Sequence, residues 1–434
     1  MKRPIVITLL GIALTLVCLG IGAVIFFTAS GGFPTNNPFD TQNISSVLEE
    51  SKTLKVDTEK TLTLKVTDDS GDVIITGADV DTVQVKVVKT AYDSSQARAD
   101  EEVKGIKYII EQTGSTITLK YELPKSMNFN NNVNAVDFIV TVPNETIVNI
   151  NTSMGEVSVA STKGSVVIKN DFGAVTVDNI EGSLSVETNS GEVTATAIKA
   201  GKADIDLHSS FDGITLEKAS GTNITLDSDG GAITLNDVRA TGELMTKSDF
   251  GDTKLENGSA NSLNVESKSG KVSLVKLKVG KELKVDNDFG DIELEQAFAG
   301  SYDLHTNSGS ITVNGAKNKL KAYTDFGSIS IENAQSVTLD LKTNSGTVEF
   351  SGSLGEGPHM VNSDFGEINL TLPTDSKLNV DLETDFGGIS SDIPLTITFD
   401  GSSDKNQQVG TMNGGGDQLT VKANSGAINI KAIK

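Results

Sequence analysis

Six copies of the tripeptide Asp-Phe-Gly are the first residues in this sequence that could do chemistry. They begin at Asp171, Asp249, Asp288, Asp325, Asp364 and Asp385. In protein kinases the aspartate of this tripeptide holds Mg²⁺, but a kinase also needs a glycine-rich nucleotide loop and a catalytic-loop motif. This sequence has neither. We therefore interpret each copy as a turn, in which the aspartate bonds to the backbone and the glycine adopts a positive φ.

The other reactive side chains form no recognisable constellation. His208, His305 and His359 are far apart in the chain, without a second histidine at metal-ligand spacing. The sequence contains no Gly-x-Ser-x-Gly nucleophile motif. The single cysteine, Cys18, lies in an apolar stretch, so no intramolecular disulfide can form. We predict no catalytic, cofactor-binding or metal-binding residues.

A turn that ends in glycine recurs through most of the chain, mostly every 18 to 21 residues. The glycines are Gly155, Gly173, Gly191, Gly231, Gly251, Gly270, Gly290, Gly309, Gly327, Gly346, Gly366 and Gly387, with Asp212 in one turn position and outlying copies at Gly71 and Gly426. Such self-similarity at a fixed period is typical of repeat architectures.

Two residues after every turn position stands a β-branched residue. These residues are Val73, Val157, Val175, Val193, Ile214, Ile233, Thr253, Val272, Ile292, Ile311, Ile329, Val348, Ile368, Ile389 and Ile428. Apolar residues then alternate with polar ones, and a second strand follows, as in Gly182 to Val186. Each unit of about 19 residues is therefore predicted to be two short strands with one apolar face.

One unit cannot fold alone. Burial of its apolar side chains contributes roughly 7–15 kcal/mol, whereas ordering its residues costs roughly 27 kcal/mol. Stacked units can fold because each strand pairs with its neighbours above and below. The sequence predicts an all-β fold, a parallel β-solenoid over residues 151–434.

The residue before the turn glycine alternates between phenylalanine and a small residue. The series is Phe172, Ser190, Phe211, Gly230, Phe250, Ser269, Phe289, Ser308, Phe326, Ser345 and Phe365, and the alternation breaks at Phe386. We infer from this pairing that one coil holds two units, so that like residues stack on like. A coil of one unit, with Phe and Ser interleaved along one edge, is the alternative.

If like stacks on like, the turn aspartates form a ladder at the strand spacing of about 4.8 Å. Neighbouring charges that close repel by about 1 kcal/mol even in water. Solvated, splayed carboxylates are the preferred interpretation, and bound Ca²⁺ is the alternative. The phenylalanines are expected to fill a corner of the core, and an exposed stripe for glycans or a partner protein is the alternative.

The segments on either side of the regular repeats differ from them. Residues 51–150 are strand-rich, with a polar helix expected from Ser94 to Val103, and we predict that this segment caps the apolar end of the solenoid. Residues 401–416 are rich in Gly, Ser and Asn and are expected to form a cap or edge loop. Asn424 to Ile430 is expected to add a last coil.

The N-terminal residues predict in which cellular compartment the rest of the chain lies. Residues 1–4 form a cytoplasmic tip that includes Lys2 and Arg3, and the uncharged run at residues 5–28 is long enough for one transmembrane helix. Cleavage near residues 28–30 is the alternative. Residues 29–50 form a flexible linker. We expect a single-pass cell-membrane protein whose bulk is extracytoplasmic.

The composition narrows the choice of partners. A formal net charge of −22 disfavours nucleic acid, because its phosphates would repel an acidic body. Only three arginines are present, Arg3, Arg98 and Arg239, so an arginine cluster for phosphate or carboxylate is nearly excluded.

The repeat resembles a known family, the bacterial β-strand-repeat putative adhesins, a domain of unknown function similar to the head domain of putative autotransporter adhesins. The residues that carry the resemblance are Val136 to Pro143 leading into Gly155, the recurring Asn-Ser-Gly and Asp-Phe-Gly turns, and the terminal Asn424 to Ile430. The resemblance implies a right-handed parallel β-solenoid at the cell surface. It supplies no catalytic residues.

We therefore expect a non-catalytic adhesin or envelope scaffold that binds an unknown surface ligand, a glycan, cell-wall polymer or protein, through an extended face. No cofactor is expected. A polysaccharide-acting β-helix enzyme is the first alternative, although such a site needs cationic groups and two carboxylates or a lysine in one local cluster. An envelope-stress accessory protein that senses through its anchor is the second.

Overall fold

The computed structural model describes residues 44–57, 59–123, 133–400 and 406–433. Across these residues it contains forty β-strands and one α-helix, and so the predicted all-β class is confirmed. The expected tip, the expected membrane span at 5–28 and most of the linker lie outside the described residues. Within the described ranges, no helix is both long enough and apolar enough to cross a membrane.

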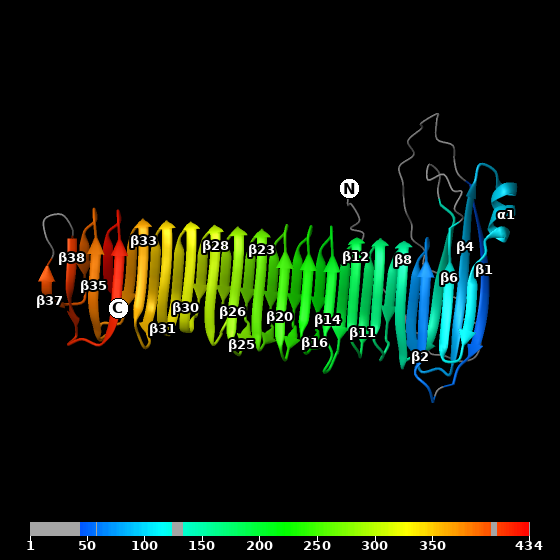
Figure 1. The fold of residues 1–434 in the computed structure, drawn as a ribbon, viewed down its shortest axis with the longest axis horizontal. Coiled ribbons are helices and arrows are strands. Elements are labelled where there is room, and N and C mark those ends of the chain that lie inside the picture. Colours follow the sequence, from blue (N-terminus) through cyan, green and yellow to red (C-terminus); the bar gives the residue numbers. More distant parts are fainter. Residues whose placement is uncertain (1–43, 58, 124–132, 401–405, 434) are drawn as a thin grey trace, which may run out of the picture. The chain divides into compact units, whose positions relative to one another are not determined.

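Two rows of stacked parallel strands form the body of the solenoid, one strand of each row in every coil (Figure 1). The first row contains β8 (Thr146–Met154), β10 (Val166–Phe172), β12 (Leu184–Ser190), β14 (Ile205–Ser209), β17 (Ile224–Ser228), β20 (Glu243–Ser248), β23 (Ser262–Ser269), β26 (Glu282–Phe289), β28 (Ser301–Ser308), β30 (Lys317–Phe326) and β33 (His359–Phe365). The second row contains β9 (Val157–Ala160), β11 (Val175–Ile180), β13 (Val193–Ile198), β15 (Ile214–Glu217), β18 (Ile233–Asn236), β21 (Thr253–Glu256), β24 (Val272–Val275), β27 (Ile292–Glu295), β29 (Ile311–Asn314), β32 (Val348–Leu354) and β34 (Ile368–Leu372).

Two further features complete the body. The long strand β31 (Ile329–Ser345) runs through both rows, because its first residues pair with β29 and its last with β30. A short third sheet closes one corner, and it consists of β16 (Ser220–Gly221), β19 (Arg239–Ala240), β22 (Ser259–Ala260) and β25 (Lys278–Val279).

Each coil contains one repeat unit, so the inference of two units per coil was wrong. In β10 and β12 Val166 pairs with Leu184, and Phe172 pairs with Ser190, one unit later. In β26 and β28 Phe289 likewise pairs with Ser308. The interleaved geometry is the correct one, and it places phenylalanine and a small residue alternately along one edge.

The core follows from the alternation of apolar residues along each strand. Inward-facing valine, isoleucine and leucine side chains form one continuous cluster through the whole stack. The β-branched residue two positions after each turn is buried in nearly every coil, as are Val175 and Ile233. At the opposite corner the chain turns through a left-handed residue, such as Asp237 with a φ of 56°. Its N–H donates to the carbonyl of Glu256 in the next coil.

The N-terminal end has an interleaved topology. Its elements are β1 (Ile44–Lys55), β2 (Leu62–Asp68), β3 (Val73–Ala78), β4 (Thr82–Asp93), α1 (Gln96–Gly105), β5 (Ile109–Thr113), β6 (Thr116–Tyr121) and β7 (Ala135–Pro143). The coil of β2 and β3 lies between the coil of β6 and β7 and that of β8 and β9, although β6 and β7 come later than β2 and β3 in the chain. Antiparallel pairs continue the sheet beyond the coil of β6 and β7, where β4 pairs with β7 and β1, and β5 pairs with β6.

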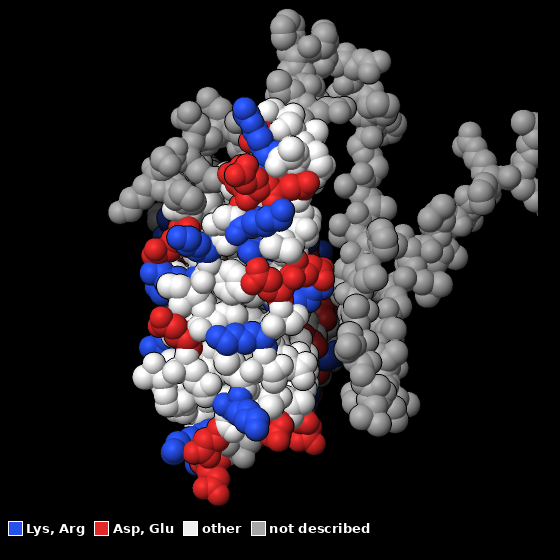
Figure 2. Space-filling model, turned by 90° about the vertical axis from the view of Figure 1, so that its right-hand side faces the viewer, with Lys and Arg blue, Asp and Glu red and all other residues white. Residues whose placement is uncertain are grey.

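The expected polar helix is present as α1, which buries Ala99 and Val103 against β1 and β4. At this end of the unit, basic and acidic side chains alternate over the surface (Figure 2). Two of the ion pairs there are Lys89 with Glu50 at 2.6 Å and Lys86 with Glu49 at 2.9 Å. Charges on an edge strand discourage further strand pairing.

The C-terminal end repeats the interleaving. Its strands are β35 (Leu378–Thr384), β36 (Ile389–Ser391), β37 (Leu395–Asp400), β38 (Asn406–Met412), β39 (Asp417–Ala423) and β40 (Ile428–Ala432). The last strands of the chain, β39 and β40, lie between β33 and β34 on one side and β35 and β36 on the other. The expectation that Asn424 to Ile430 adds a last coil was therefore wrong, because this segment fills an inner position and antiparallel β37 and β38 form the end.

The turn glycines are required by close backbone contact between coils. A Cβ added at Gly346 would lie 2.0 Å from the carbonyl oxygen of Gly327, and one at Gly327 would lie 2.0 Å from that of Gly309. Several turn glycines also have a positive φ, for example 142° at Gly290, but Gly327 and Gly346 do not. Close approach along the stack therefore explains the glycines more fully than turn conformation does.

Replacement of one turn glycine should weaken the stack. We expect Gly346→Ala to lower the free energy of unfolding by about 1–3 kcal/mol, because the added methyl must push two coils apart. Gly388→Ala is the control, since a Cβ at Gly388 meets nothing within 4 Å. Urea unfolding followed by circular dichroism measures both, and equal midpoints for the two variants would contradict the close-contact explanation.

Candidate functional site: a phenylalanine ridge

A row of exposed phenylalanines runs along the edge where each first-row strand meets its turn. We call it the phenylalanine ridge, and its members are Phe172, Phe211, Phe250, Phe289, Phe326, Phe365 and Phe386. Their exposed fractions are 59–85%. The expectation that these rings fill a corner of the core was wrong, because the strand alternation ends at the turn and the ring projects from its tip.

In the folded protein, phenylalanine and a small residue continue to alternate at the ridge position from coil to coil, and this holds through the interleaved C-terminal end. In sequence Phe386 follows Phe365 in the turn series, which appears as a break. In the fold the turn of Ser425 lies between them, since the Phe386 N–H donates to the carbonyl of Asn424 and Ser425 donates to that of Asp364. Each ridge phenylalanine is thus separated from the next by one coil with Ser or Gly, and the ridge repeats every two coils.

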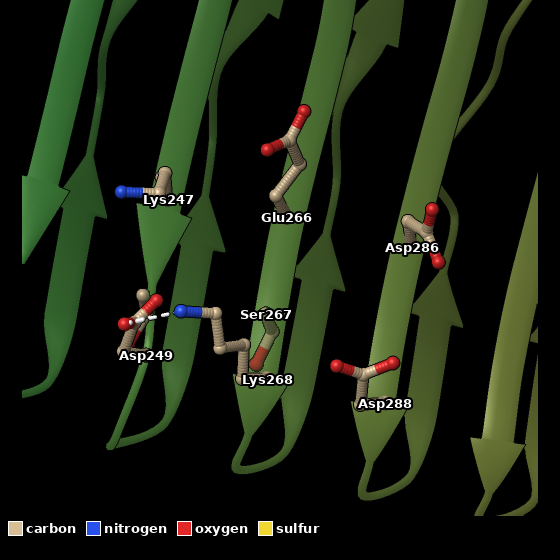
Figure 3. Close-up of a pocket in the computed structure, with 8 residues that line it drawn as sticks. Lys247, Asp249, Glu266, Ser267, Lys268, Asp286 and Asp288 are labelled. Carbon is tan, nitrogen blue, oxygen red and sulfur yellow. Dashed lines mark hydrogen bonds and ion pairs between the residues drawn. The ribbon is translucent and has the colours of Figure 1, made fainter. Parts of the chain in front are cut away.

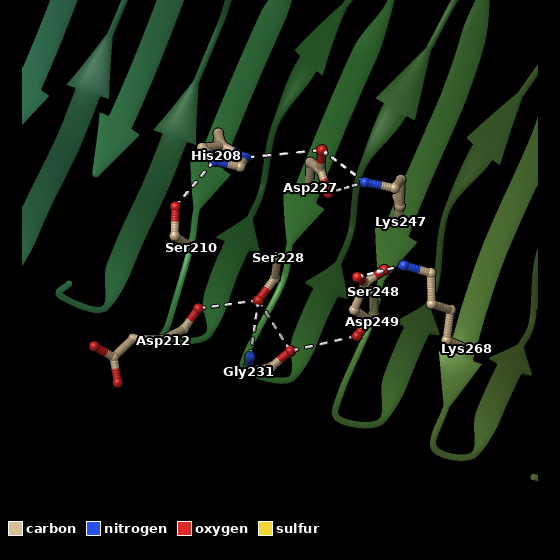
Figure 4. A network of polar contacts seen from close by, with 10 residues as sticks. All are labelled: His208, Ser210, Asp212, Asp227, Ser228, Gly231, Lys247, Ser248, Asp249 and Lys268. Carbon is tan, nitrogen blue, oxygen red and sulfur yellow. Dashed lines mark hydrogen bonds and ion pairs between the residues drawn. The ribbon is translucent and has the colours of Figure 1, made fainter. Parts of the chain in front are cut away.

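Directly inside the ridge lies a buried polar ladder, three residues before each turn position. Its members are Thr152, Asn170, Thr188, Ser209, Ser228, Ser248, Ser267, Asn287, Thr306, Thr324, Thr343, Ser363 and Thr384. Most donate to turn carbonyls, and Ser228 Oγ lies 3.0 Å from the carbonyl oxygens of both Gly231 and Asp212, either of which can accept its single hydrogen (Figure 4). These bonds satisfy carbonyl groups that point into the corner.

Sequence reasoning missed this ladder, although a signal for it exists. Most turns read Asn-Asp-Phe-Gly, Thr-Asn-Ser-Gly, Ser-Asp-Phe-Gly or Thr-Asp-Phe-Gly, and the others also begin with Ser or Thr, so a small polar residue stands at a fixed place in an otherwise apolar series. A polar residue repeated at an inward-facing position indicates a hydrogen-bonding role.

The aspartates of the Asp-Phe-Gly turns do not stack on one another as predicted. Because one coil holds one unit, the aspartate of one coil generally meets an amide or lysine from the next. Asn189 Nδ2 donates to Asp171 at 2.8 Å, and Asn307 Nδ2 donates to Asp288 at 2.9 Å. The repulsion that motivated the Ca²⁺ alternative is thereby largely removed. Among the described residues no cluster of three or more metal-ligating side chains occurs.

A shallow depression of about 180 Å³ beside the ridge shows the same pairing (Figure 3). It is lined by Lys247, Glu266, Lys268, Asp286 and Asp288, among others. Lys268 Nζ lies 2.5 Å from Asp249. Charges of both signs therefore meet one another here.

The three histidines lie at separate places in the fold. His208 and His305 lie on the outer face of the first row, where His305 Nδ1 is 2.9 Å from Asp286 and the ring stacks on Tyr323. His208 Nδ1 is 3.7 Å from Asp227, which also pairs with Lys247 (Figure 4). His359 is buried, and burial lowers its pKa. The three do not share a site.

Asp68 continues the polar ladder by one coil beyond Thr152, and its side chain is buried in the coil of β2 and β3. Ser70 N–H donates to its Oδ1 at 3.0 Å, but Oδ2 has no partner. Burial, together with the nearby carboxylates of Asp137, Asp69 and Asp72, raises the pKa of Asp68 to about 8. Asp68 is therefore a protonated member of the ladder at neutral pH.

The fold defines a class, the repetitive parallel β-solenoids with one unit per coil. The family comparison is more specific, because residues 64–257 and 254–431 match the Toastrack DUF4097 family. These matches cover most of the chain, which therefore belongs to that family. The resemblance to bacterial β-strand-repeat proteins is thereby confirmed. Comparison with curated proteins found no match.

Three solved structures are similar at low sequence identity. A putative cell adhesion protein from Clostridium sporogenes is 11% identical, with 89% of this chain and 100% of that chain covered and a TM-score of 0.22. A putative adhesin from Bacteroides fragilis is 12% identical, with 89% and 97% covered and a TM-score of 0.21. A putative lipid binding protein from Parabacteroides distasonis is 15% identical, with 65% and 96% covered and a TM-score of 0.32.

The protonation of Asp68 predicts a pH dependence of stability. Its pKa is higher in the folded than in the unfolded chain, so the folded state binds more protons and the free energy of unfolding falls as pH rises from about 4 to about 8. Asp68→Asn should remove this loss and raise the stability at pH 8 by about 1–3 kcal/mol, because an amide can donate where a carboxylate cannot.

Urea unfolding at pH 5 to 9 measures the effect. The advantage of Asp68→Asn over the natural chain should grow with pH, whereas Asp79→Asn, at an exposed position, should follow the natural chain throughout. Parallel curves for Asp68→Asn and the natural chain would show that Asp68 is not protonated in the fold.

Proposed function

We propose that this chain is a non-catalytic, adhesin-like envelope protein that binds an extended surface ligand along the phenylalanine ridge. The observation that carries the proposal is the row of seven phenylalanines, each at least 59% exposed and each separated from the next by one small residue. A row of large exposed apolar side chains gathered on one edge of a folded protein indicates an interaction site.

The small residues supply the argument against a structural role for the ridge. Ser190, Ser269, Ser308 and Ser345 occupy the same place in the turn as the phenylalanines, on coils that pair in the same register. The fold therefore does not require an aromatic ring at this place. Exposed rings that the fold does not need are best explained by a ligand that covers them.

Localisation and attachment follow from the N-terminal residues. Lys2 and Arg3 would remain in the cytoplasm, the apolar run at 5–28 would span the membrane, and the solenoid would project outward. In this arrangement the ligand is a surface glycan, a cell-wall polymer or a protein. The ion pairs of Lys268 with Asp249 and of Lys247 with Asp227 support binding without catalysis, because each of these two carboxylates is engaged by a lysine.

Removal of the central ridge tests the proposal. The variant Phe250→Ser/Phe289→Ser/Phe326→Ser gives three coils the residue that their neighbours already carry. We expect detergent-solubilised full-length chain with these changes to be retained on isolated bacterial envelopes about tenfold less than the natural chain, since aromatic anchors carry most binding energy at such surfaces. Co-sedimentation measures the retention.

A matched control uses an exposed phenylalanine elsewhere. Phe298 is 40% exposed and lies in a corner away from the turns, next to Lys278 of the third sheet. Phe298→Ser should leave retention unchanged. Equal retention of the triple variant and the natural chain, with both folded by circular dichroism, would refute the ridge as a binding surface.

A further inference from the structure

The repeat distance of the ridge restricts the ligands that can follow it. Neighbouring coils are one strand spacing apart, so phenylalanines on alternate coils are about 9.6 Å apart. The seven rings from Phe172 to Phe386 are therefore separated by six equal intervals along the edge of the stack. A ligand that contacts every ring needs a repeat close to this distance.

Among regular polypeptide conformations, polyproline II has the closest repeat. Three residues with a rise of about 3.1 Å each give a turn of about 9.3 Å. An extended β-strand presents one face every two residues, about 6.6 Å, and an α-helix has a pitch of about 5.4 Å. Over six intervals the mismatch with polyproline II amounts to about 2 Å, which side-chain rotation can absorb.

The charge beside the ridge restricts the ligand further. Seven aspartates stand directly before the ridge position, namely Asp171, Asp229, Asp249, Asp288, Asp325, Asp364 and Asp385, and five acidic residues stand directly after the turn glycine, namely Glu156, Glu192, Asp252, Asp291 and Glu367. At the same positions the only basic residues are Lys268 and Lys271, against these twelve acidic residues. An acidic ridge favours a basic ligand and disfavours a second copy of the chain or an anionic membrane.

We propose that the phenylalanine ridge binds a basic, proline-rich polypeptide segment in the polyproline II conformation, one turn of the segment for every two coils. This inference rests on the proposed function and names its ligand. Proline rings would pack on Phe250, Phe289 and Phe326, and lysine or arginine side chains would reach the flanking carboxylates. A polyproline II backbone remains hydrated and makes no internal hydrogen bonds, so it needs no free strand edge.

The small residues between the rings fit the same geometry. Ser269, Ser308 and Ser345 leave a gap beside each ring. In each turn of the ligand one residue faces a ring, and the other two can extend into this gap. A phenylalanine on every coil would close these gaps. The alternation along the ridge is therefore explained by the ligand repeat as well as by the ligand chemistry.

Synthetic peptides test the inference directly. Fluorescence anisotropy with the full-length chain would compare labelled (Pro-Pro-Lys)6 with (Gly-Gly-Lys)6, which has the same charge without the conformation, and with (Pro-Pro-Lys)2. We expect (Pro-Pro-Lys)6 to bind about tenfold more tightly than either, because only this peptide engages several rings in register. The Phe250→Ser/Phe289→Ser/Phe326→Ser variant should lose this advantage, and Phe298→Ser should keep it.

Each contrary result has a distinct meaning. Equal binding of (Gly-Gly-Lys)6, or binding that the triple variant does not change, would overturn the inference in favour of simple charge attraction. Binding of a chitin hexasaccharide to the ridge, with no binding of (Pro-Pro-Lys)6, would overturn it in favour of a glycan. If the triple variant loses envelope retention but no peptide binds, the proposed function stands and this inference fails.

Discussion

The approach of one turn glycine to the carbonyl of the turn below is the contact on which the rest of the structure depends. A Cβ at Gly309 would lie 2.1 Å from the oxygen of Gly290, and comparable distances recur along the stack. With the exception of Asp212, the turn positions hold glycine, which allows strands joined by such a turn to remain at hydrogen-bonding distance in the next coil. Each repeat unit can therefore occupy one coil, and the units share one register except for local shifts where β31 pairs with β30 and β32.

A common register places equivalent residues on equivalent lines. Apolar residues form the core, hydroxyl and amide side chains bond to the turn carbonyls inside the corner, and aspartates alternate largely with amides outside it. At the ridge position, coils that pair in the same register carry Ser, Gly or Phe. Packing between coils therefore does not determine the residue at this position.

Much of the fold could be predicted from the sequence, because its signals are local. The β-branched residue after each turn and the alternation beyond it indicate stacked strands, and the structure confirms them at Val175 and Ile233. The number of units in a coil could not be decided from the sequence, since the Phe and Ser series fits either geometry. The exposure of Phe289 could not be predicted either. Side chains alternate between the two faces of a strand, but this alternation does not continue into the tip of a turn.

The interleaved strand order at the two ends of the solenoid could not be predicted from local sequence patterns. Ser425 follows Phe386 in the chain but lies before it in the stack, and only the pairing of β39 with both β33 and β35 shows this. The polar ladder could have been recognised from the fixed residue three before each turn. The predicted ladder of aspartates does not form, because with one unit in each coil an Asp-Phe-Gly aspartate generally lies next to an amide or a lysine.

Disulfide trapping tests the central claim, one unit per coil in a shared register, most directly. In a Cys18→Ala background, Asp288→Cys/Asn307→Cys places two thiols on adjacent coils, within the separation that a disulfide can bridge, whereas Asp288→Cys/Asp325→Cys places them about 9.6 Å apart, too far to bridge. Mild oxidation followed by non-reducing electrophoresis should show a rapid intramolecular crosslink for the first pair and none for the second. Crosslinking of the second pair without the first would mean that a coil holds two units, and the account of the ridge would fail with it.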